Sequence, residues 1–546
     1  MEMLHTTPEQ EERYLACGMW GHLTLVERFR EHAAAAPDRL AIIDAKRQYT
    51  YGQLAGIVDN LATNFLKMGV ARNQVVACQV PNWAELAIVH LATNRIGALC
   101  MPIHDSWREA EVAHLLKRSG AVAAVVPLYY GGFDFPAMIA GMRSELPKLG
   151  KIFSIGGTGP NSSAFEALLD DIPIDTGALD ARRPHANEPG DLMLSSGTTS
   201  MPKISIWSSN NLYAALRAFS LAIRFVPGDI AAALAPAGTG GLGYGFPIVA
   251  PLLFGGTSVI LERWDPVAGV ELIRRHRCTC AVAVPAQMTQ MLPVLEAHSP
   301  ADFDGFRTFF NAGAPLPYKV GRQVEERMNC RVICNFGATD GGVVGSTVMD
   351  DPQEKRLGTV GRPWEAHEVK LVDANGKQVG PGEPGEIYWR SPDKSYGYLN
   401  DPEATGAAFT PDGFYRSGDL GRFDDEGYLM IVGRVKDMIL RGGRNISPRL
   451  IEEEMIKHPA IAEVAVAPMP DPVLGERACA FVILRKDAAL SFEEVIAFLK
   501  ERKVSVWQLP ERLELMQDFP RSAGGKIAKN KLTEFVTLKL KENADR

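Results

Sequence analysis

The sequence predicts a layered α/β protein with a large N-terminal part, a small antiparallel β subdomain and a small α+β C-terminal part. Three observations carry this prediction. Buried strand-like runs alternate with helical runs over most of the chain. Short alternating strands with turn signals begin near residue 385, and a compact run of helix, strand, strand and helix follows residue 433. The 546 residues leave room for roughly two to four domains.

The first elements alternate in type along the chain. Residues 74–80 are apolar and β-branched, which predicts a buried strand, and residues 82–96 repeat apolar positions at helical spacing. A helix is predicted at 268–275, and further buried strands at 121–127, 229–234, 257–261 and 279–284. Apolar strands separated by helices are typical of sheets that are covered on both faces.

The residue pattern changes in the later part of the chain. Residues 385–389 alternate in polarity, and turn signals follow at Asp412-Gly413 and Asp425-Glu426-Gly427, which predicts an antiparallel subdomain. After Gly433 the pattern predicts a compact α+β unit with a short tail. Its predicted elements are helices at 447–458 and 491–503 and strands at 461–468 and 478–485.

Composition limits the classes of partner. With 58 Lys+Arg against 65 Asp+Glu, the net charge is -7, which disfavours sequence-independent binding to nucleic acid. No apolar run approaches the roughly 18 residues of a membrane span, and the N-terminus lacks the layout of a signal peptide. We therefore expect a soluble cytoplasmic protein with no nucleic-acid partner. The eight cysteines lack paired CxxC spacing, which indicates buried, reduced thiols.

A strand that opens into small hydroxylated residues is the first candidate site. The apolar residues 192–194 lead into a run that ends with a lysine: Ser195, Ser196, Gly197, Thr198, Thr199, Ser200, Met201, Pro202 and Lys203. The glycine lets backbone N–H groups turn toward one point, and the hydroxyls and the lysine add donors, which is typical of a phosphate-binding loop. The GxxxxGK[ST] loop is absent, and a plain polar turn is the alternative.

A second glycine-rich run competes with the first. Gly238 to Gly243 matches GxGxxG after a predicted strand, with Glu262 about 20 residues further on, which is the pattern of a dinucleotide site. An NAD-dependent oxidoreductase is therefore an alternative of another class. That fingerprint requires an unbroken helix after the third glycine, whereas Gly245, Pro247 and Pro251 follow here. We expect loop backbone beside a pocket instead.

Ordered motifs along essentially the whole chain resemble the adenylate-forming (ANL) superfamily, which contains acyl-CoA synthetases, adenylation domains of peptide synthetases and luciferases. The motifs are Gly197-Thr198-Thr199 with Pro202-Lys203, Gly313-Ala314-Pro315, Asn335 to Asp340, Tyr415 to Asp419, Gly433 to Asp437 with Gly442-Gly443, and Pro520 to Lys526. The resemblance implies an N-terminal domain, residues 1–435, for ATP and the carboxylate. It also implies a small mobile C-terminal cap, residues 436–546, that turns about a hinge at Lys436.

The implied activity is that of an acid–thiol ligase. A carboxylate and ATP give acyl-AMP and pyrophosphate, and a thiol, favoured to be that of coenzyme A, then displaces AMP. Because the first step holds two anions together, each needs a cation. By resemblance, Lys526 bridges the substrate carboxylate and the α-phosphate.

The resemblance assigns the other roles residue by residue. Thr198, Thr199 and Lys203 would hold the β- and γ-phosphates, and Thr339 would contact the α-phosphate. Ser195, Ser196 and Gly197 of the same loop would also bind ATP. Asp340 would hold magnesium, a hard cation suited to carboxylate oxygen. The remaining ATP contacts would be Gly313, Ala314, Pro315, Asn335, Phe336, Gly337, Asp419 and Arg434. Two departures, Ser200 for glycine and Asp340 for glutamate, leave a non-catalytic acyl-binding protein as an alternative.

The resemblance specifies fewer residues for the acyl and thiol sites than for the nucleotide site. Gly442, Gly443 and Arg444 would line the coenzyme A site, with Arg441 and Arg449 as further phosphate ligands. Thr239, Gly240 and Gly241 would line the acyl pocket, and their small size predicts an aromatic, alicyclic (cyclohexanecarboxylate-like) or short- to medium-chain acid. Delivery to a carrier-protein pantetheine is the alternative, disfavoured because no carrier domain follows Lys526. A protein acetyltransferase acting on Lys526, as on some relatives, is a further expected partner.

Overall fold

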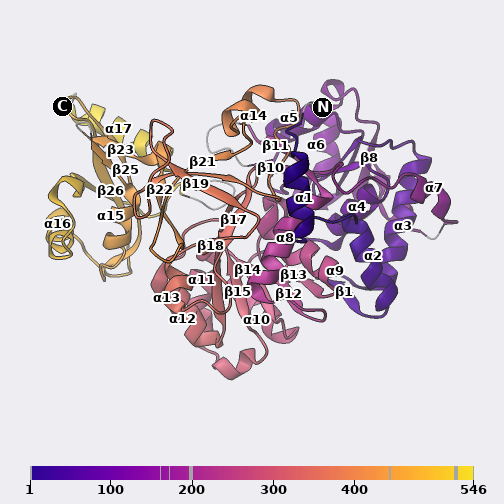
Figure 1. Cartoon of the computed structure of the whole chain (residues 1–546), viewed down its shortest axis with the longest axis horizontal. Coiled ribbons are helices and arrows are strands. Elements are labelled where there is room, and N and C mark those ends of the chain that lie inside the picture. The colour runs from indigo at the N-terminus through magenta and orange to yellow at the C-terminus, as the bar shows by residue number, and fades with distance from the viewer. Residues whose placement is uncertain are drawn as a thin grey trace. The chain divides into compact units, whose positions relative to one another are not determined.

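The computed structural model describes residues 3–159, 161–170, 172–195, 201–441, 444–521 and 527–544 (Figure 1). Only the backbone is described at Thr239, Arg444, Asn445 and residues 541–544. The chain divides into two compact units. The first consists of residues 1–369 and 389–415, and the second of residues 370–388 and 416–546.

The first unit contains a seven-stranded sheet of order β11-β10-β4-β3-β5-β8-β9. Its central strands are parallel, and β10 pairs antiparallel with β11 at the edge. The strands are β3 (Val75–Cys78), β4 (Leu99–Pro102), β5 (Ala123–Pro127), β8 (Lys151–Ile155), β9 (Ser163–Ala164), β10 (Pro189–Ser195) and β11 (Lys203–Ser208). A separate hairpin joins β6 (Tyr129–Tyr130) to β7 (Phe133–Asp134).

A nine-stranded sheet of order β18-β17-β16-β15-β14-β12-β13-β1-β2 completes the strands of this unit. Its six middle strands run parallel, so the carboxyl ends of β12, β14, β15 and β16 lie at one edge. The strands are β1 (Leu40–Ile43), β2 (Gln48–Thr50), β12 (Ile230–Ala233), β13 (Thr257–Ile260), β14 (Cys280–Ala283), β15 (Thr308–Asn311), β16 (Arg331–Ala338), β17 (Gly342–Ser346) and β18 (Arg362–Pro363).

Helices cover these sheets. Several begin at a Thr or Ser that accepts the N3 backbone N–H, such as Thr24, Thr50 and Ser208. The helices are α1 (Pro8–Ala16), α2 (Leu25–Ala35), α3 (Tyr51–Lys67), α4 (Ala84–Arg95), α5 (Glu109–Ser119), α6 (Phe135–Gly141), α7 (Thr176–Ala181), α8 (Ser209–Ile223), α9 (Ala250–Phe254), α10 (Pro266–Arg275), α11 (Pro285–Leu295), α12 (Tyr318–Met328), α13 (Gln353–Gly358) and α14 (Pro402–Ala408). Short 3-10 turns lie at Arg143–Glu145, Glu166–Leu168, Ala237–Thr239 and Pro300–Phe303.

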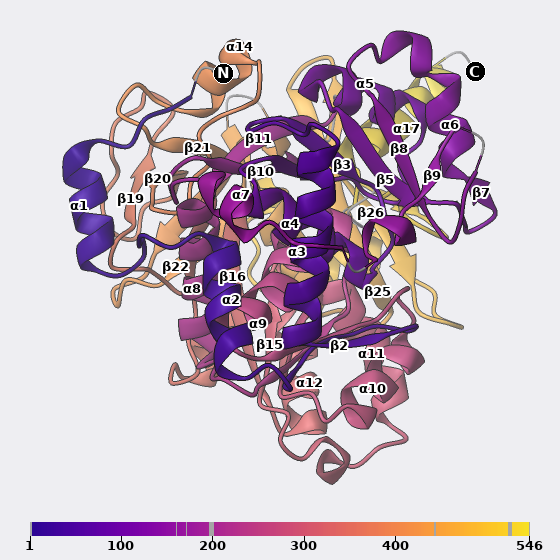
Figure 2. The ribbon, with the colours of Figure 1, turned by 90° about the vertical axis from the view of Figure 1, so that its right-hand side faces the viewer.

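Helix α4 lies at the centre of the largest core cluster. Every residue from Ala84 to Arg95 is buried, because α4 packs against α2 and α3 on one side and β4 and β10 on the other. Figure 2 shows α2, α3 and α4 side by side. The same cluster contains Cys100 of one sheet and Ala231 and Cys280 of the other, so one apolar core supports both sheets.

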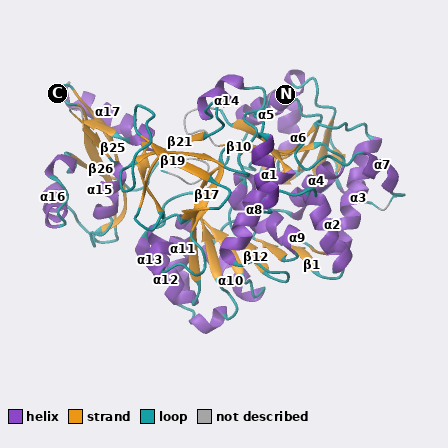
Figure 3. Ribbon diagram, in the orientation of Figure 1, coloured by secondary structure: helices purple, strands orange, loops and turns teal. Residues whose placement is uncertain are grey.

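The second unit has two sheets of its own. The first sheet has the order β19-β20-β21-β22, and most of it lies in this unit; β21 and β22 are antiparallel. The second sheet has the order β24-β23-β26-β25, with β27 beside β26 (Figure 3). The strands are β19 (Glu368–Val372), β20 (Gly385–Arg390), β21 (Tyr415–Phe423), β22 (Leu429–Arg434), β23 (Ile439–Arg441), β24 (Arg444–Ile446), β25 (Ile461–Asp471), β26 (Gly475–Leu484) and β27 (Arg512–Leu515). The helices are α15 (Pro448–Met455), α16 (Phe492–Glu501) and α17 (Lys529–Ala544), with 3-10 turns at Val435–Asp437 and Val506–Gln508.

The predicted α/β fold class is confirmed, and most predicted strands and helices match within a few residues. Two expectations are wrong. The expected tail is the 16-residue helix α17, whose Leu532 and Val536 are fully buried with Phe481, so packing on the sheet fixes it. The expected loop after Gly240 is a π-helix, Gly241–Val249, whose wider turn accommodates Pro247.

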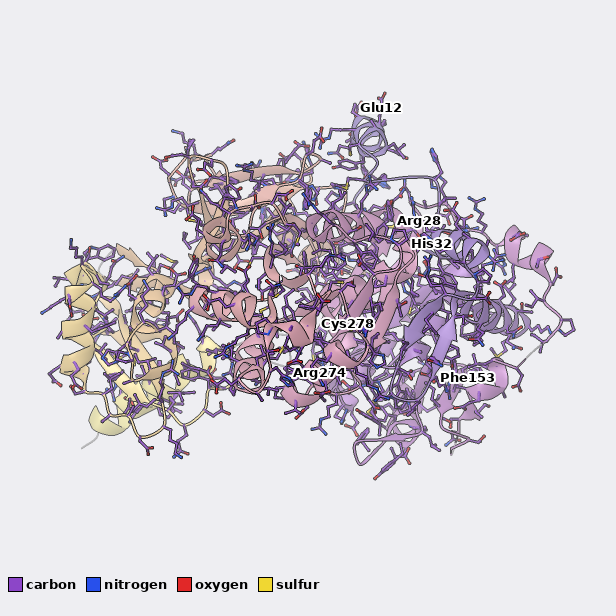
Figure 4. The ribbon with its side chains drawn as sticks, turned by 90° about the horizontal axis from the view of Figure 1, so that it is seen from below. Glu12, Arg28, His32, Phe153, Arg274 and Cys278 are labelled. Atoms are coloured by element: carbon purple, nitrogen blue, oxygen red, sulfur yellow. The ribbon has the colours of Figure 1, made fainter. Side chains whose placement is uncertain are left out.

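Seven of the eight cysteines are buried, as expected for reduced thiols in a core. Cys278, labelled in Figure 4, lies just before β14, and burial raises the pKa of its thiol to about 12. Within the described ranges, no helix is both long enough and apolar enough to cross a membrane.

Candidate functional site

The β10–β11 hairpin carries the predicted phosphate loop. Ser195 and Lys203 are paired residues at its loop end, so the chain leaves and re-enters the sheet at neighbouring positions. Residues 196–200, including Ser196, Gly197, Thr198 and Thr199, lie outside the described residues. The structure therefore brings together the two ends of the predicted loop.

Asp340 is the centre of a buried polar cluster beside this hairpin. The Tyr398 hydroxyl donates to Asp340 Oδ2 over 2.8 Å, and the Lys203 Nζ lies 4.8 Å from the centre of the Tyr398 ring. Burial raises the pKa of Asp340 to about 6, opposed by the Tyr398 hydrogen bond, the charge of Lys203 and the nearby Ser195 hydroxyl. Asp340 Oδ1 is buried and has no hydrogen-bond partner among the described residues.

The turn that holds Asp340 is fixed by the segment that also carries Tyr398. Trp389 Nε1 donates to the Gly341 carbonyl over 2.6 Å, and Ser395 N–H donates to the Asp340 carbonyl over 3.1 Å. Asp393 accepts the Val343 N–H over 2.8 Å. Together with the Tyr398 hydrogen bond, these contacts come from four residues of one segment, so the position of the Asp340 carboxylate depends on tertiary packing.

The other predicted nucleotide residues of this unit lie on adjacent parallel strands. Gly313, Ala314 and Pro315 follow β15, and Gly313 has φ +87° with no room for a side chain, since a Cβ would lie 2.8 Å from Leu242 Cδ1. Asn335, Phe336 and Gly337 lie near the end of β16, which pairs with β15. Asn335 Nδ2 donates to the Gly345 carbonyl over 3.2 Å, and Phe336 packs edge-on against Trp389.

Two glycines at the predicted acyl pocket are favoured for different reasons, close packing at Gly238 and a positive φ at Gly240. A Cβ at Gly238 would lie 2.4 Å from the His104 Cα, which follows β4. Gly240 has φ +70°, and its Cβ would lie 3.8 Å from Thr339 Cγ2. The predicted pocket residue Gly240, which directly precedes the π-helix, therefore lies beside the predicted α-phosphate residue.

In the second unit, Asp419 and Arg434 face each other across β21 and β22. They are register partners, and Arg434 Nε lies 2.7 Å from Asp419 Oδ1. Lys436 follows in the 3-10 turn Val435–Asp437. Arg441 is paired with Glu511 at 2.6 Å and Arg449 with Glu453 at 2.7 Å. Gly442, Gly443 and Lys526 lie outside the described residues, and only the backbone of Arg444 is described, in β24.

Sequence reasoning missed Tyr398. It lies 58 residues from Asp340 along the chain, and no local periodicity links the two. The only signal is the sequence Tyr396-Gly397-Tyr398, in which Gly397 has φ +95°. A left-handed glycine between two tyrosines marks a turn with a specific geometry, but does not name the partner.

Comparisons with known proteins identify the family of the chain. The profile of the family described as AMP-binding enzyme matches residues 29–399, and that of the AMP-binding enzyme C-terminal domain matches residues 450–526. Among curated proteins, the chain is 33% identical to a medium-chain fatty-acid–CoA ligase of Escherichia coli, over 100% of this chain and 96% of that one. It is 32% identical to a 2-hydroxy-7-methoxy-5-methyl-1-naphthoate–CoA ligase of Streptomyces carzinostaticus, over 95% and 94% of the two chains.

A third curated relative has a different printed activity. A salicyl-AMP ligase / salicyl-S-ArCP synthetase of Mycobacterium tuberculosis is 32% identical over 96% of this chain and 93% of that one. Among solved structures, the anthranilate CoA ligase AuaEII in complex with anthranoyl-AMP superposes with a TM-score of 0.85 at 23% identity, over 95% of this chain and 98% of that one. The chain is thus a member of the AMP-binding enzyme family, the ATP-dependent adenylate-forming ligases that activate carboxylates as acyl-AMP.

Proposed function

We propose that this chain is an AMP-forming carboxylate–coenzyme A ligase. The observation that carries the proposal is the buried Asp340–Tyr398 pair beside Lys203, at the loop end of the β10–β11 hairpin. A family member without catalysis would have no need to keep, in a buried site, a carboxylate oxygen that has no partner among the described residues, because such an atom costs about 1–3 kcal/mol.

The residues at this site suit ATP. Lys203 is a mobile cation at the end of the predicted phosphate loop, where Ser195, Thr198 and Thr199 would add hydroxyl donors. Gly313 to Pro315 and Asn335 to Gly337 would receive the adenine at the ends of adjacent strands, and Asp419 with Arg434 would contact the ribose. Thr339 lies next to Gly240 and would hold the α-phosphate beside the acyl group.

Magnesium fits the same cluster. Asp340 Oδ1 is a buried carboxylate oxygen without a partner in the part of the chain that the structure describes, and carboxylate oxygen is the donor that Mg²⁺ prefers; Tyr398 fixes the other oxygen. When bound, the ion would neutralise phosphate charge. Aspartate is one methylene shorter than the glutamate usual here, and the Tyr398 hydrogen bond fixes where this shorter side chain points.

The second unit would supply the moving groups. Lys526 would bridge the attacking carboxylate and the α-phosphate, and such focused electrostatic stabilisation of charge is worth roughly 3 kcal/mol. Rotation about Lys436 would then bring Gly442, Gly443 and Arg444 to the acyl-AMP for attack by the thiol of CoA. In this proposal residues 1–435 form the catalytic body and residues 436–546 the cap.

The identity of the acyl acceptor and that of the acid are proposed on different grounds. Two relatives are CoA ligases, which favours free CoA, while the salicyl-AMP ligase keeps a carrier-protein pantetheine as the second candidate. The glycines beside Thr339 favour a small hydrophobic acid, aromatic, alicyclic or of short to medium chain. A cytoplasmic location and acetylation of Lys526 stay predictions.

Pyrophosphate release from the purified chain tests the proposal. With ATP, Mg²⁺ and a panel of small acids, at least one acid should release pyrophosphate, and CoA should then yield its thioester by mass spectrometry. Lys526→Ala should lose the first step yet still convert supplied acyl-AMP to the thioester, whereas Lys531→Ala, an exposed lysine nearby, should retain both steps. Absence of acid-dependent pyrophosphate release would refute ligase activity; transfer to a carrier protein but not to CoA would refute the acceptor.

A further inference from the structure

A small cavity lies behind the glycine-rich segment of the predicted acyl pocket. Gly238 and Gly240 form part of its wall, Met193 and Leu212 make it apolar on other sides, and its volume is about 10 Å³. That is the space of one water-sized group. A ring does not fit there, whereas a single substituent of a ring or chain does.

One side of this cavity is polar and is built from three distant elements. His90 of α4 has its Nδ1 2.5 Å from the Tyr244 hydroxyl, and its Nε2 2.6 Å from Asp191 Oδ1. Tyr244 belongs to the π-helix and Asp191 to β10, four residues before Ser195. All three side chains are at least nine-tenths buried, with residue exposures of 1% for His90, 2% for Tyr244 and 3% for Asp191.

The chain of contacts leaves hydrogen-bonding capacity unused. Asp191 Oδ2 is buried and has no hydrogen-bond partner among the described residues. A tyrosine hydroxyl has one proton and two acceptor positions, and His90 Nδ1 uses only one of these. Burial raises the pKa of Tyr244 well above its usual range, so the group stays a neutral hydroxyl. An apolar group placed in the cavity would leave Asp191 Oδ2 without a partner and the remaining hydrogen-bonding capacity of the Tyr244 hydroxyl unused.

The glycine wall of the cavity lies beside the predicted α-phosphate residue. A Cβ at Gly240 would lie 3.8 Å from Thr339 Cγ2, so one backbone segment separates the polar chain from the predicted α-phosphate residue. Leu194, another wall residue, directly precedes Ser195. An acid whose carboxylate is held near Thr339 would therefore point its far end across Gly240 toward Tyr244.

We propose that this cavity binds a hydroxyl substituent of the substrate acid, with Tyr244 and Asp191 as its hydrogen-bonding partners and His90 as the residue that positions both. The inference rests on the proposed function and narrows its substrate class to hydroxylated small acids. A hydroxyl matches the site because it is the size of a water molecule and both donates and accepts. A methyl group has a similar size but satisfies neither polar atom.

Matched acids test the proposal. Pyrophosphate release is measured for benzoate, the monohydroxybenzoates and the corresponding toluates, and for cyclohexanecarboxylate and octanoate with and without a hydroxyl. In the wild type, kcat/KM for one hydroxylated acid should exceed that of its plain partner and its methyl analogue at least 10-fold. In Tyr244→Phe this ratio should fall to about 3-fold or less while the plain acid is still turned over, and Tyr213→Phe, a buried tyrosine of α8, should keep the wild-type ratio.

The ratio of kcat/KM for two acids within one variant does not depend on how much of the enzyme is folded, because both acids are assayed with the same enzyme preparation. Equal or better use of plain acids by the wild type would overturn the inference and would indicate that the cavity holds only an ordered water. An unchanged ratio in Tyr244→Phe would overturn it as well. If no acid releases pyrophosphate, the proposed function fails and the inference falls with it, a result distinct from turnover without discrimination.

Discussion

The Tyr398 hydroxyl donates a 2.8 Å hydrogen bond to Asp340 Oδ2 across 58 residues of sequence, and both side chains are buried. The pair joins the turn after β16 to a segment near the end of the first unit, and Lys203 lies against the same tyrosine ring. One carboxylate oxygen is thereby fixed, and the other is left without a partner among the described residues. The first two predictions concern this pair.

Removing the hydroxyl of Tyr398 should weaken the adenylation step. In Tyr398→Phe the carboxylate loses a hydrogen bond worth about 1.5–3 kcal/mol, so its position and its ionised form are both less favoured. We expect kcat/KM for ATP to fall about 10- to 100-fold and the half-saturating Mg²⁺ concentration to rise, measured by pyrophosphate release. Tyr213→Phe serves as the control; equal losses in both variants would contradict a specific role for Tyr398.

Replacing Asp340 by asparagine should stabilise the fold while abolishing activity. The pKa of Asp340 is raised from 3.8 to about 6 in the folded state, so its contribution to stability is present below pH 4 and is lost as the pH rises to about 6. At pH 7 the ionised carboxylate therefore destabilises the wild type, by an amount of the order of 3 kcal/mol.

Thermal unfolding of the wild type and Asp340→Asn tests whether the substitution stabilises the protein at pH 7. The variant should have the higher Tm at pH 7, and the difference should shrink toward pH 4.5. A variant that is less stable than the wild type at pH 7 would show that the carboxylate has a cation partner in the folded protein.

Lys394 should likewise destabilise the fold at neutral pH. It is 3% exposed, and burial with the nearby charge of Arg390 lowers the pKa of its ammonium from 10.5 to about 8. The penalty for burying the charge is absent above pH 10.5, develops as the pH falls from 10.5 to about 8, and is complete below that. Lys394→Met should therefore raise the free energy of unfolding at pH 7 by about 1–3 kcal/mol, with a smaller gain at pH 10. Urea unfolding at the two pH values measures the difference, and an equal gain at both would contradict it.

Two glycine-to-alanine changes should have opposite effects on stability. Gly238→Ala places a Cβ 2.4 Å from the His104 Cα, so the two backbone segments must move apart, at a cost of about 1–3 kcal/mol. Gly56→Ala in α3 meets no atom within 4 Å and should stabilise the helix by about 0.5–1 kcal/mol. Chemical denaturation measures both. If Gly238→Ala is neutral, close packing is not the reason for glycine at that position.

Much of the fold could be predicted because the local spacing of apolar residues indicates most of its strands and helices. The apolar runs at β3, β5, β12, β13 and β14 are buried on both faces, and this needs only local hydrophobicity to recognise. Helix α17 was missed although Leu532, Val536 and Leu540 recur at helical spacing, since short amphipathic segments depend on the surface they cover. The π-helix after Gly240 was missed because Pro247 and the glycines contradict an α-helix locally.

The sequence by itself determined the family, because its motifs depend on residue types in a fixed order, and it predicted which residues would contact the nucleotide. Only the tertiary structure decided that Tyr398 meets Asp340, that Gly238 packs against His104, and that His90 links Tyr244 to Asp191. The physical reason is that a hydrogen bond or a van der Waals contact depends on distances of a few ångströms between residues far apart in the chain. No local periodicity specifies such distances, and they are set when the two sheets pack around their common core.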